Sequence, residues 1–274
     1  MRIKKILNNN AAIVIEDKQE KIVIGPGIAF NKGKNDLINR NKIDKLFVIK
    51  NDDHFEQLLP QIPVELMAIT QEIIQYAEDR LEVKLNPHIF IALADHLSFA
   101  IERHEDGIYI KNKLLSEIKI LYKKEFDIGI WAINHVKEKI GIQMPIDEAA
   151  FIALHLHTAS IPSGNLQVSL RQTSIINEIV HMIRDYFSIS LEETGLSYER
   201  LITHFRYTLY RVNEAPERTM DEEMLMMISS KFPSSYQCAK TIAEHLSTQH
   251  GIHLPSEEIG YITIHIERLR GRKG

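Results

Sequence analysis

The chain has 274 residues, 44% hydrophobic and 26% charged, which is ordinary for globular domains and sufficient for two or three cores. Basic residues interrupt positions 1–7 and no stretch is long enough to span a membrane, so neither a signal peptide nor membrane insertion is predicted. A single cysteine, Cys238, excludes an internal disulfide framework and fits a cytoplasmic location.

The formal net charge of −4 is unevenly distributed. Residues 1–50 hold 11 Lys and Arg against 5 Asp and Glu, a net charge of +6, which leaves −10 for the remainder. Lys and Arg bind phosphates by displacing counterions, so a basic head followed by an acidic body predicts that the head binds a polyanion.

Short runs of β-favouring residues, separated by turn residues, occupy the head. The runs lie at residues 3–7, 11–15, 22–24 and 43–49, with further β-favouring side chains at Ile28 and Phe30. About fifty residues bury only a small core, so an all-β domain of this size gains stability from dimerisation. We therefore expect a dimeric all-β domain over residues 1–55.

The turns of the head are rich in residues that suit a nucleic acid. Asparagines 8–10 can bond base edges, glycines 25 and 27 permit close backbone approach, Phe30 offers a stacking face, and nearby lysines can neutralise phosphate. The head has neither a recognition-helix pattern nor zinc-ligand spacing, which favours RNA over the DNA major groove. The alternative is that these segments are plain turns and that Phe30 lies in the small core.

After the head, Pro60 and Pro63 indicate a connector, which we place at residues 56–64. Apolar residues then recur at helical intervals in two stripes, one on each side of a junction near residues 161–165. The sequence thus predicts two helical domains, at 65–168 and 169–274. The stripes consist of Leu66, Ile69, Ile73, Ala77 and Leu81, and of Ile176, Ile179, Val180, Ile183 and Phe187.

The two helical segments are copies of one pattern, offset by 106 residues at the start and 110 at the end. A slowly drifting offset is what small loop insertions between duplicated units produce. The first copy contains Glu72, Asp79, His96, Pro145, Glu148, Phe151 and His155, and the second contains Glu178, Asp185, His204, Pro255, Glu258, Tyr261 and His265. Each copy therefore carries two histidines, which only its fold can bring together.

The repeated histidines have three interpretations. A single histidine on a helix is usually structural. Metal binding is suggested by His155-x-His157 if that segment is extended, but Glu267 replaces the second histidine in the other copy and no zinc motif is present, so no metal site is predicted. Phosphoryl acceptance is the third, because neutral imidazole is a nucleophile near pH 7 and phosphate adds close to two negative charges. Arg103 and Arg206 are candidate phosphate partners, or else solvated surface charges.

No motif of an enzyme is present. The chain lacks a Gly-x-Ser-x-Gly elbow, a Walker loop and a dinucleotide fingerprint, so neither catalysis nor a cofactor is predicted.

Residues 3–10 together with residues 25–30 resemble the co-antiterminator RNA-binding domain of bacterial sugar-operon antiterminators of the β-glucoside and sucrose type. The tandem repeat is similar to the two phosphotransferase-system regulation domains that follow it in that family. The resemblance implies a small all-β N-terminal domain that dimerises, followed by two tandem all-α helical-bundle domains. It also implies that the dimer stabilises a leader RNA hairpin and so prevents formation of a terminator.

By the same resemblance, the RNA-contact positions are Lys5, Asn8, Asn10, Gly25, Gly27 and Phe30. Pro26 stands where the family often has a basic residue, so we assign more of the affinity to Lys32 and Lys34. The phosphorylation positions are His96, His155, His204 and His265.

In the family, the sugar-specific permease phosphorylates the first regulation domain and silences the protein. The histidine phosphocarrier protein phosphorylates the second and commonly activates it. Two other classes remain open from the residues. One is a DNA-binding sugar-operon activator with the same regulatory modules, whose head would show a helix-turn-helix. The other is a metal-binding or purely structural helical protein.

Overall fold

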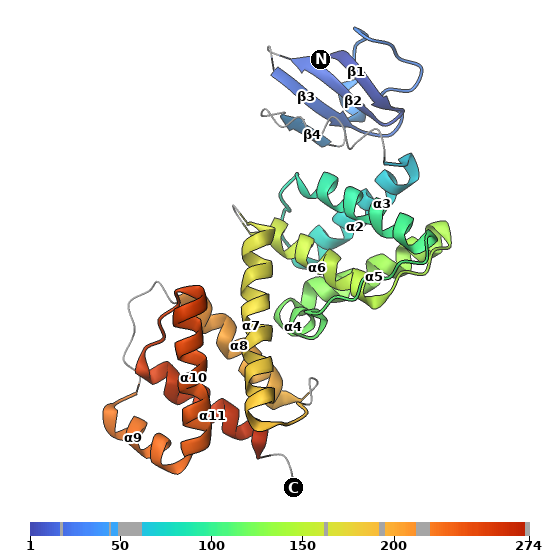
Figure 1. The fold of residues 1–274 in the computed structure, drawn as a ribbon. Helices are drawn as coiled ribbons and strands as arrows, with labels where there is room; N and C mark the ends of the chain where they lie inside the picture. The colour runs from blue at the N-terminus through green and yellow to red at the C-terminus, as the bar shows by residue number, and fades with distance from the viewer. Residues whose placement is uncertain are drawn as a thin grey trace. The chain divides into compact units, whose positions relative to one another are not determined.

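The computed structural model describes residues 1–16, 19–43, 45–48, 62–161, 164–191, 195–211 and 220–271. Within these ranges, an antiparallel sheet near the N-terminus is followed in sequence by helices and by no further strand (Figure 1). This order confirms the predicted fold class. Of the predicted connector at 56–64, only residues 62–64 lie within the described ranges.

The head forms a four-stranded antiparallel sheet whose strands lie in sequence order. The strands are β1 (Arg2–Asn8), β2 (Ala11–Glu16), β3 (Gln19–Ile24) and β4 (Lys45–Val48). The pairing of β1 with β2 is irregular between Ile3 and Lys5 and again between Ile6 and Asn8. All four predicted runs therefore become strands. Ile28 and Phe30 do not extend them, because residues 25–30 form successive turns in which Ile28 donates to the Gly25 carbonyl and Phe30 to that of Gly27.

The loop after β3 completes the core of the head. Ile28, Ala29 and Ile38 are buried with the sheet residues Ile3, Ala12, Val14 and Val23, and Met1 and Ile43 pack at the edge. A 3-10 turn, η1 (Arg40–Lys42), precedes β4, and the side chain of its N-cap residue Asn39 accepts from the Asn41 amide. The described part of the head thus contains no α-helix, and the DNA-binding alternative lacks its helix-turn-helix there.

In the described ranges, each repeat supplies five α-helices in the same order. The first repeat contains α2 (Val64–Leu81), α3 (Ile89–Glu105), α4 (Leu115–Leu121), α5 (Lys123–Ile140) and α6 (Ile146–Ser160). The second contains α7 (Leu166–Phe187), α8 (Leu196–Arg211), α9 (Glu222–Lys231), α10 (Pro233–His250) and α11 (Ser256–Arg270).

Helix ends confirm that these helices are equivalent. The residues that end α4 and α9, Tyr122 and Phe232, have similar backbone angles, with φ of −124° and −128° and ψ of 47° and 58°. Gly141 and Gly251, which follow α5 and α10, both take positive φ, at 78° and 68°. Only glycine enters that region without steric cost, so the duplication preserves a requirement of the backbone.

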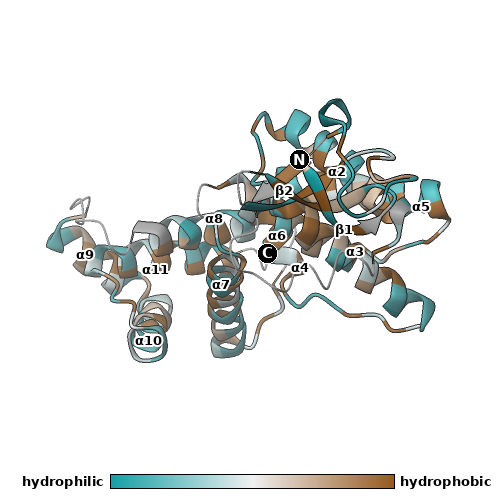
Figure 2. Cartoon of the chain, turned by 90° about the horizontal axis from the view of Figure 1, so that it is seen from above, coloured by the Kyte–Doolittle hydropathy of each residue, from teal (hydrophilic) through white to brown (hydrophobic). Residues whose placement is uncertain are grey.

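Most residues of the predicted apolar stripes lie on the buried faces of α2 and α7. Leu66, Ile69, Ile73 and Ala77 of α2 are buried, as are Ile176, Ile179, Val180 and Ile183 of α7. The mixture of hydrophilic and hydrophobic colouring along α7 and α10 in Figure 2 is that of amphipathic helices. In the described residues, no helix combines the length and apolar character that crossing a bilayer requires.

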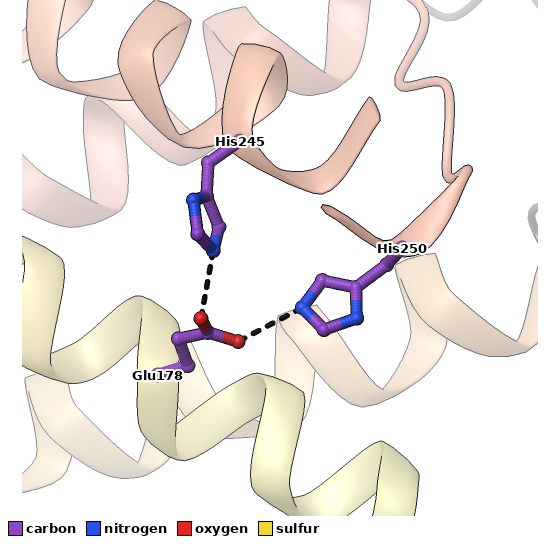
Figure 3. A group of neighbouring side chains, drawn as sticks. All are labelled: Glu178, His245 and His250. Atoms are coloured by element: carbon purple, nitrogen blue, oxygen red, sulfur yellow. Dashed lines mark hydrogen bonds and ion pairs between the residues drawn. The ribbon is translucent and has the colours of Figure 1, made fainter. Parts of the chain in front are cut away.

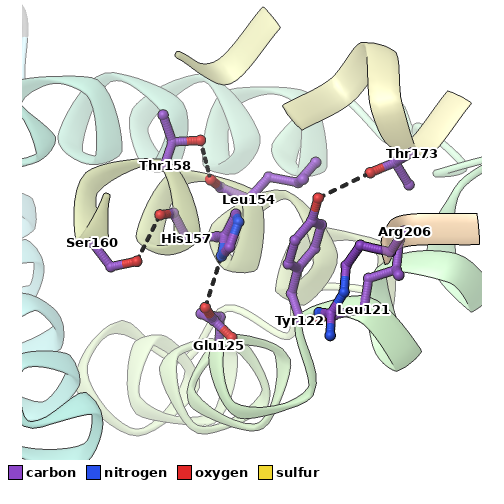
Figure 4. A network of polar contacts seen from close by, with 9 residues as sticks. All are labelled: Leu121, Tyr122, Glu125, Leu154, His157, Thr158, Ser160, Thr173 and Arg206. Atoms are coloured by element: carbon purple, nitrogen blue, oxygen red, sulfur yellow. Dashed lines mark hydrogen bonds and ion pairs between the residues drawn. The ribbon is translucent and has the colours of Figure 1, made fainter. Parts of the chain in front are cut away.

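The chain divides into two compact units that do not follow the repeat boundary. One unit contains Met1–Asn112 and Lys124–Leu166, and the other contains Lys113–Lys123 and Gln167–Gly274. Helix α4 belongs to the second unit through three hydrogen-bonding contacts, two of which involve residues drawn in Figure 4. Tyr198 Oη donates to Glu117 Oε1 at 2.8 Å, Arg206 Nη1 donates to the Leu121 carbonyl at 2.7 Å, and Tyr122 Oη lies 3.3 Å from Thr173 Oγ1.

Candidate functional sites

The first repeat brings its two histidines together between α3 and α6. The rings of His96 and His155 lie 5.2 Å apart between centroids. His96 Nε2 lies 3.0 Å from Glu148 Oε2, and Arg103 Nη2 donates to the other oxygen, Glu148 Oε1, at 3.1 Å. The first site therefore combines two imidazoles, a carboxylate and a guanidinium.

The second repeat builds the same site between α8 and α11. The ring centroids of His204 and His265 lie 4.8 Å apart, and His204 Nε2 lies 3.3 Å from Glu258 Oε2. Here the hydroxyl of Thr208 donates to Glu258 Oε2 at 3.0 Å. The predicted pairing of histidines is thus present as geometry in both repeats.

Helical spacing and a proline place the carboxylate. Pro145 and Pro255 are the N-cap residues of α6 and α11, and Glu148 and Glu258 fall in the first helical turn, where the helix dipole stabilises negative charge. The histidines follow seven residues later in each helix and so return to the same face. The repeated Pro-x-x-Glu pattern is visible in the sequence, but only the fold shows that its glutamate faces a histidine.

Burial lowers the pKa of three of the four histidines. Desolvation lowers the pKa of His155 to about 4, helped by the charge of His96, and it lowers the pKa of His204 as well. Desolvation also lowers the pKa of His265 to about 4, with smaller contributions from His204 and two arginines. Burial acts to raise the pKa of Glu148, but its bonds to His96 and Arg103 outweigh this and hold that pKa below its usual value.

The carboxylate favours one tautomer of the neighbouring imidazole. An ionised carboxylate only accepts hydrogen bonds, so its position 3.0 Å from His96 Nε2 and 3.3 Å from His204 Nε2 favours a hydrogen on Nε2, although the His96 contact lacks hydrogen-bond geometry. Their Nδ1 atoms then hold the free lone pair, and the carboxylate stabilises positive charge that develops on the ring. Nδ1 of His204 is fully buried and has no hydrogen-bond partner among the described residues, so phosphoryl acceptance there requires the second site to open.

The two arginines singled out in the sequence take different positions. Arg103 lies in the first site, whereas Arg206 donates to the Leu121 carbonyl and lies 5.4 Å over the Tyr207 ring. By the repeat offset, the position equivalent to Arg103 is Arg211, whose side chain lies outside the described ones.

The structural premise of the metal interpretation of His155-x-His157 is wrong. The segment is helical, and residues two apart on a helix face different directions. His157 Nδ1 lies instead 3.0 Å from Glu125 Oε1 (Figure 4).

In the head, the β1–β2 turn and the loop at 25–30 form one hydrogen-bonded unit. Asn10 Oδ1 accepts from the Gly27 amide at 2.7 Å, and the Asn10 carbonyl accepts from the Gly25 amide at 2.9 Å. The Asn9 carbonyl accepts from the Ala29 amide at 3.0 Å. Gly27 has φ of 59°, which its lack of a Cβ permits.

This unit presents Phe30 to solvent. The side chain of Phe30 is 58% exposed, so the interpretation of Phe30 as a core residue is wrong. Lys5 on β1 and Lys34 in the loop are exposed, while Lys32 is half-buried and its Nζ donates to the Leu37 carbonyl at 2.9 Å. The side chain of Asn8 lies outside the described ones.

An exposed aromatic on a basic all-β head, followed by duplicated helical repeats with paired histidines, fits the class of RNA-binding regulators that are controlled through helical domains. The chain matches the CAT RNA binding domain over residues 1–56 and the PRD domain over residues 71–159 and 177–269. It belongs to the family of sugar-operon transcription antiterminators that combine these domains, and this confirms the predicted resemblance.

Two full-length relatives illustrate the family. The chain is 38% identical over 274 residues to Transcription antiterminator LicT of Bacillus subtilis, covering 98% of this chain and 99% of the relative. It is 35% identical to the Beta-glucoside operon antiterminator of Dickeya chrysanthemi, covering 98% and 97%. The crystal structure of GlcT CAT-PRDI matches with a TM-score of 0.51 and 38% identity, over 59% of this chain and 98% of that one. Family members are regulators rather than enzymes, as predicted.

Proposed function

We propose that this chain is a homodimeric, cytoplasmic antiterminator that binds a leader RNA hairpin of a sugar-utilisation operon. In this proposal the clamped hairpin keeps an overlapping terminator from forming, so transcription continues. The RNA surface comprises Lys5, Asn8, Asn10, Gly25, Gly27, Phe30, Lys32 and Lys34. The hydrogen-bonded unit of the β1–β2 turn and the loop at 25–30, with Phe30 exposed on it, supports this surface.

The paired histidines are the control elements in this proposal, and the His–carboxylate geometry of both repeats is the observation that carries it. The sugar-specific permease phosphorylates His96 or His155 when its sugar is absent, and the histidine phosphocarrier protein phosphorylates His204 or His265. Phosphate on His96 or His204 repels the neighbouring carboxylate, and this repulsion is relieved when the helix that carries the histidine and the helix that carries the glutamate separate.

The two sites differ in how strongly phosphate disturbs them. The Glu148 side chain is 4% exposed and held by Arg103, whereas that of Glu258 is 26% exposed and held by a threonine hydroxyl. Phosphate at His96 therefore disturbs a buried ion network, and Arg103 can exchange Glu148 for phosphate as its partner. Phosphate at His204 meets a carboxylate that already contacts water. This difference supports silencing through the first repeat and a milder, activating response in the second.

The test is phosphate transfer from phosphorylated histidine phosphocarrier protein to the intact chain, mapped by mass spectrometry under alkaline conditions that preserve phosphohistidine. We expect label on His204 or His265 and its loss when the labelled residue is replaced by Ala. In a parallel binding assay, a fragment of residues 1–55 should bind a leader RNA hairpin whether or not the phosphotransferase proteins are present. An active carrier that labels none of the four histidines of the folded chain would remove the control mechanism. A folded head that ignores every candidate leader hairpin would remove the RNA function.

A further inference from the structure

Each repeat contains a second histidine–carboxylate contact, separate from the paired histidines. In the first repeat, His135 of α5 contacts Glu72 of α2, with Nε2 2.5 Å from Oε2. In the second, His245 of α10 contacts Glu178 of α7, with Nε2 2.8 Å from Oε1. The pattern is duplicated, but the third member of each cluster differs.

In the first repeat a lysine completes the cluster, and in the second a histidine does. Lys139 Nζ lies 2.9 Å from Glu72 Oε2, so a protein cation neutralises that carboxylate. By the repeat offset the position of Lys139 corresponds to Gln249, and the next residue, His250, places its Nε2 2.8 Å from Glu178 Oε2. The second cluster therefore has two imidazoles where the first has an imidazole and an ammonium group.

The three side chains of the second cluster converge as metal ligands do. Figure 3 shows both imidazoles directed at the two oxygens of Glu178. One nitrogen or oxygen from each residue lies within 4.8 Å of the others, and all three side chains are half-buried. Bonds of about 2.0–2.2 Å to nitrogen and oxygen at a tetrahedral ion set ligand atoms roughly 3.3–3.5 Å apart, so small side-chain rotations suffice.

We propose that Glu178, His245 and His250 bind a divalent transition-metal ion of the Zn²⁺ class. Two neutral imidazoles and one carboxylate suit Zn²⁺ and disfavour Mg²⁺ or Ca²⁺, which prefer oxygen ligands. A water molecule completes the tetrahedron, because Glu178 is 41% exposed and leaves one side of the cluster open. This site is independent of the proposed phosphorylation of His204 and His265.

The ion would join two helices of the second repeat. Glu178 lies within α7, whereas His245 and His250 lie in the last turns of α10, which ends at His250. Binding therefore stabilises the packing of α7 against the end of α10 by the usual linkage of ligand binding to folding. In the first repeat, Lys139 of α5 connects to Glu72 of α2 by an ion pair, so no metal ion is needed there.

The experiment titrates the untagged full-length chain with Co²⁺, follows the visible absorption band of tetrahedral cobalt, and then displaces Co²⁺ with Zn²⁺. We expect one equivalent per chain. His250→Gln or Glu178→Gln should weaken binding at least about tenfold while the helical circular dichroism is unchanged. The matched control is the double variant His135→Gln with Lys139→Gln in the first repeat, which should bind as tightly as the original chain.

Two outcomes overturn the proposal. One is the absence of a tetrahedral cobalt band from the folded full-length chain. The other is a band that survives in the His245→Gln and His250→Gln double variant, which would place the ion elsewhere. Replacing His155 and His265 by Gln identifies the paired histidines as that other location if the band then disappears. Failure here leaves the antiterminator proposal intact, since that proposal is tested by phosphate transfer and RNA binding.

Discussion

Glu148 and Glu258 do more than neutralise neighbouring cations, because each favours one tautomer of a histidine. The contacts of His96 and His204 with these glutamates favour the hydrogen on Nε2 and the lone pair on Nδ1. Where a carboxylate orients a metal-binding histidine, mutating that carboxylate costs roughly tenfold to a hundredfold in metal affinity or activity, and we expect an effect of similar size on a histidine that accepts phosphate.

Replacing Glu148 by Gln should therefore slow phosphorylation of His96 by roughly tenfold or more. The neutral amide can face Nε2 through either its oxygen or its nitrogen, so it no longer selects one tautomer. Nitrogen-15 NMR of the imidazole should show the Nε2–H form in the original chain and a mixture in the variant. Glu258→Gln is the matched control and should affect His204 alone. Equal effects of each variant on both histidines would contradict the assignment.

Asn10→Ala should loosen the loop that carries Phe30. The change removes the acceptor of the Gly27 amide, at a cost of about 1–2 kcal/mol to the head. Hydrogen exchange should accelerate at residues 25–30, and affinity for RNA should fall. Asn9→Ala is the control, because the contact of Asn9 with Ala29 uses the backbone carbonyl. Unchanged exchange at residues 25–30 in Asn10→Ala would show that the side chain does not hold the loop.

At the candidate sites, the sequence supplied the residues but not their contacts. The repeat identified all four paired histidines, since identity at equivalent positions is visible without a structure. It did not show that Arg206 turns to the Leu121 carbonyl, or that Lys139 and His250 occupy corresponding clusters at positions one residue apart. Those outcomes depend on side-chain directions across helices that are far apart in the sequence.

Among the elements, the two helix pairs that hold the histidines should respond to acid. His155 and His265 have a pKa of about 4 when folded and about 6.5 when unfolded, so the unfolded chain binds more protons between these values. Stability is full above pH 6.5 and is lost as the pH falls toward 4, by on the order of 3 kcal/mol for His155 and by less for the more exposed His265. The lowered pKa of Glu148 acts in the same direction below pH 4.5.

Urea unfolding of the full chain at several pH values between 7.5 and 4.5 tests this response. The double variant His155→Gln with His265→Gln should show a shallower decline of unfolding free energy with falling pH. Comparing slopes rather than midpoints keeps the test valid when the variant is less stable throughout. Identical slopes would show that these histidines do not govern the response.

The contact between α5 and α6 depends on Gly129. A Cβ at that position would lie 2.3 Å from the Ala149 carbonyl oxygen, so Gly129→Ala should destabilise the first repeat by about 1–3 kcal/mol. Thermal unfolding checks the prediction, with Asp127→Ala on the exposed face of α5 as the control. The equivalent position in the second repeat is Ala239, which is fully buried, so the two repeats pack differently here. A Gly129→Ala variant as stable as the original chain would contradict the close packing.

The order and type of the elements could be predicted from the sequence because each follows a local period. Strand runs alternated with turns, and the helical stripes of α2 and α7 became buried faces. Residues 25–30 departed from this rule, since Ile28 and Phe30 favour strands but Asn10 and the positive φ of Gly27 hold the loop in turns. A contact made by a residue fifteen or more positions away overrides local preference there.

At the scale of the whole molecule, charge separation should make RNA binding strongly dependent on salt. The head carries +6 and the rest of the chain −10, so the net attraction to phosphate comes from the head. The logarithm of the binding constant should fall linearly with the logarithm of salt concentration. Replacing Lys5 or Lys34 by Ala should reduce that slope by about 0.9 for each phosphate that the lysine no longer neutralises. A slope that stays the same in both variants would remove these lysines from the interface. Glu20→Gln on β3, two strands away from Lys5, is a control because it changes the net charge without removing a lysine.

Because α4 packs with the second repeat, a functional hybrid of two relatives should take α4 and the second repeat from the same parent. Helix α4 precedes α5 and α6 in the sequence, yet the buried Tyr198 of α8 donates to Glu117 on α4. A hybrid gene spliced near residue 168 would inherit Tyr198 from one parent and its acceptor from another. A hybrid in which residues 113–123 and 167–274 share a parent keeps the partners together. The building block is therefore discontinuous in the gene, although each repeat is continuous in the sequence.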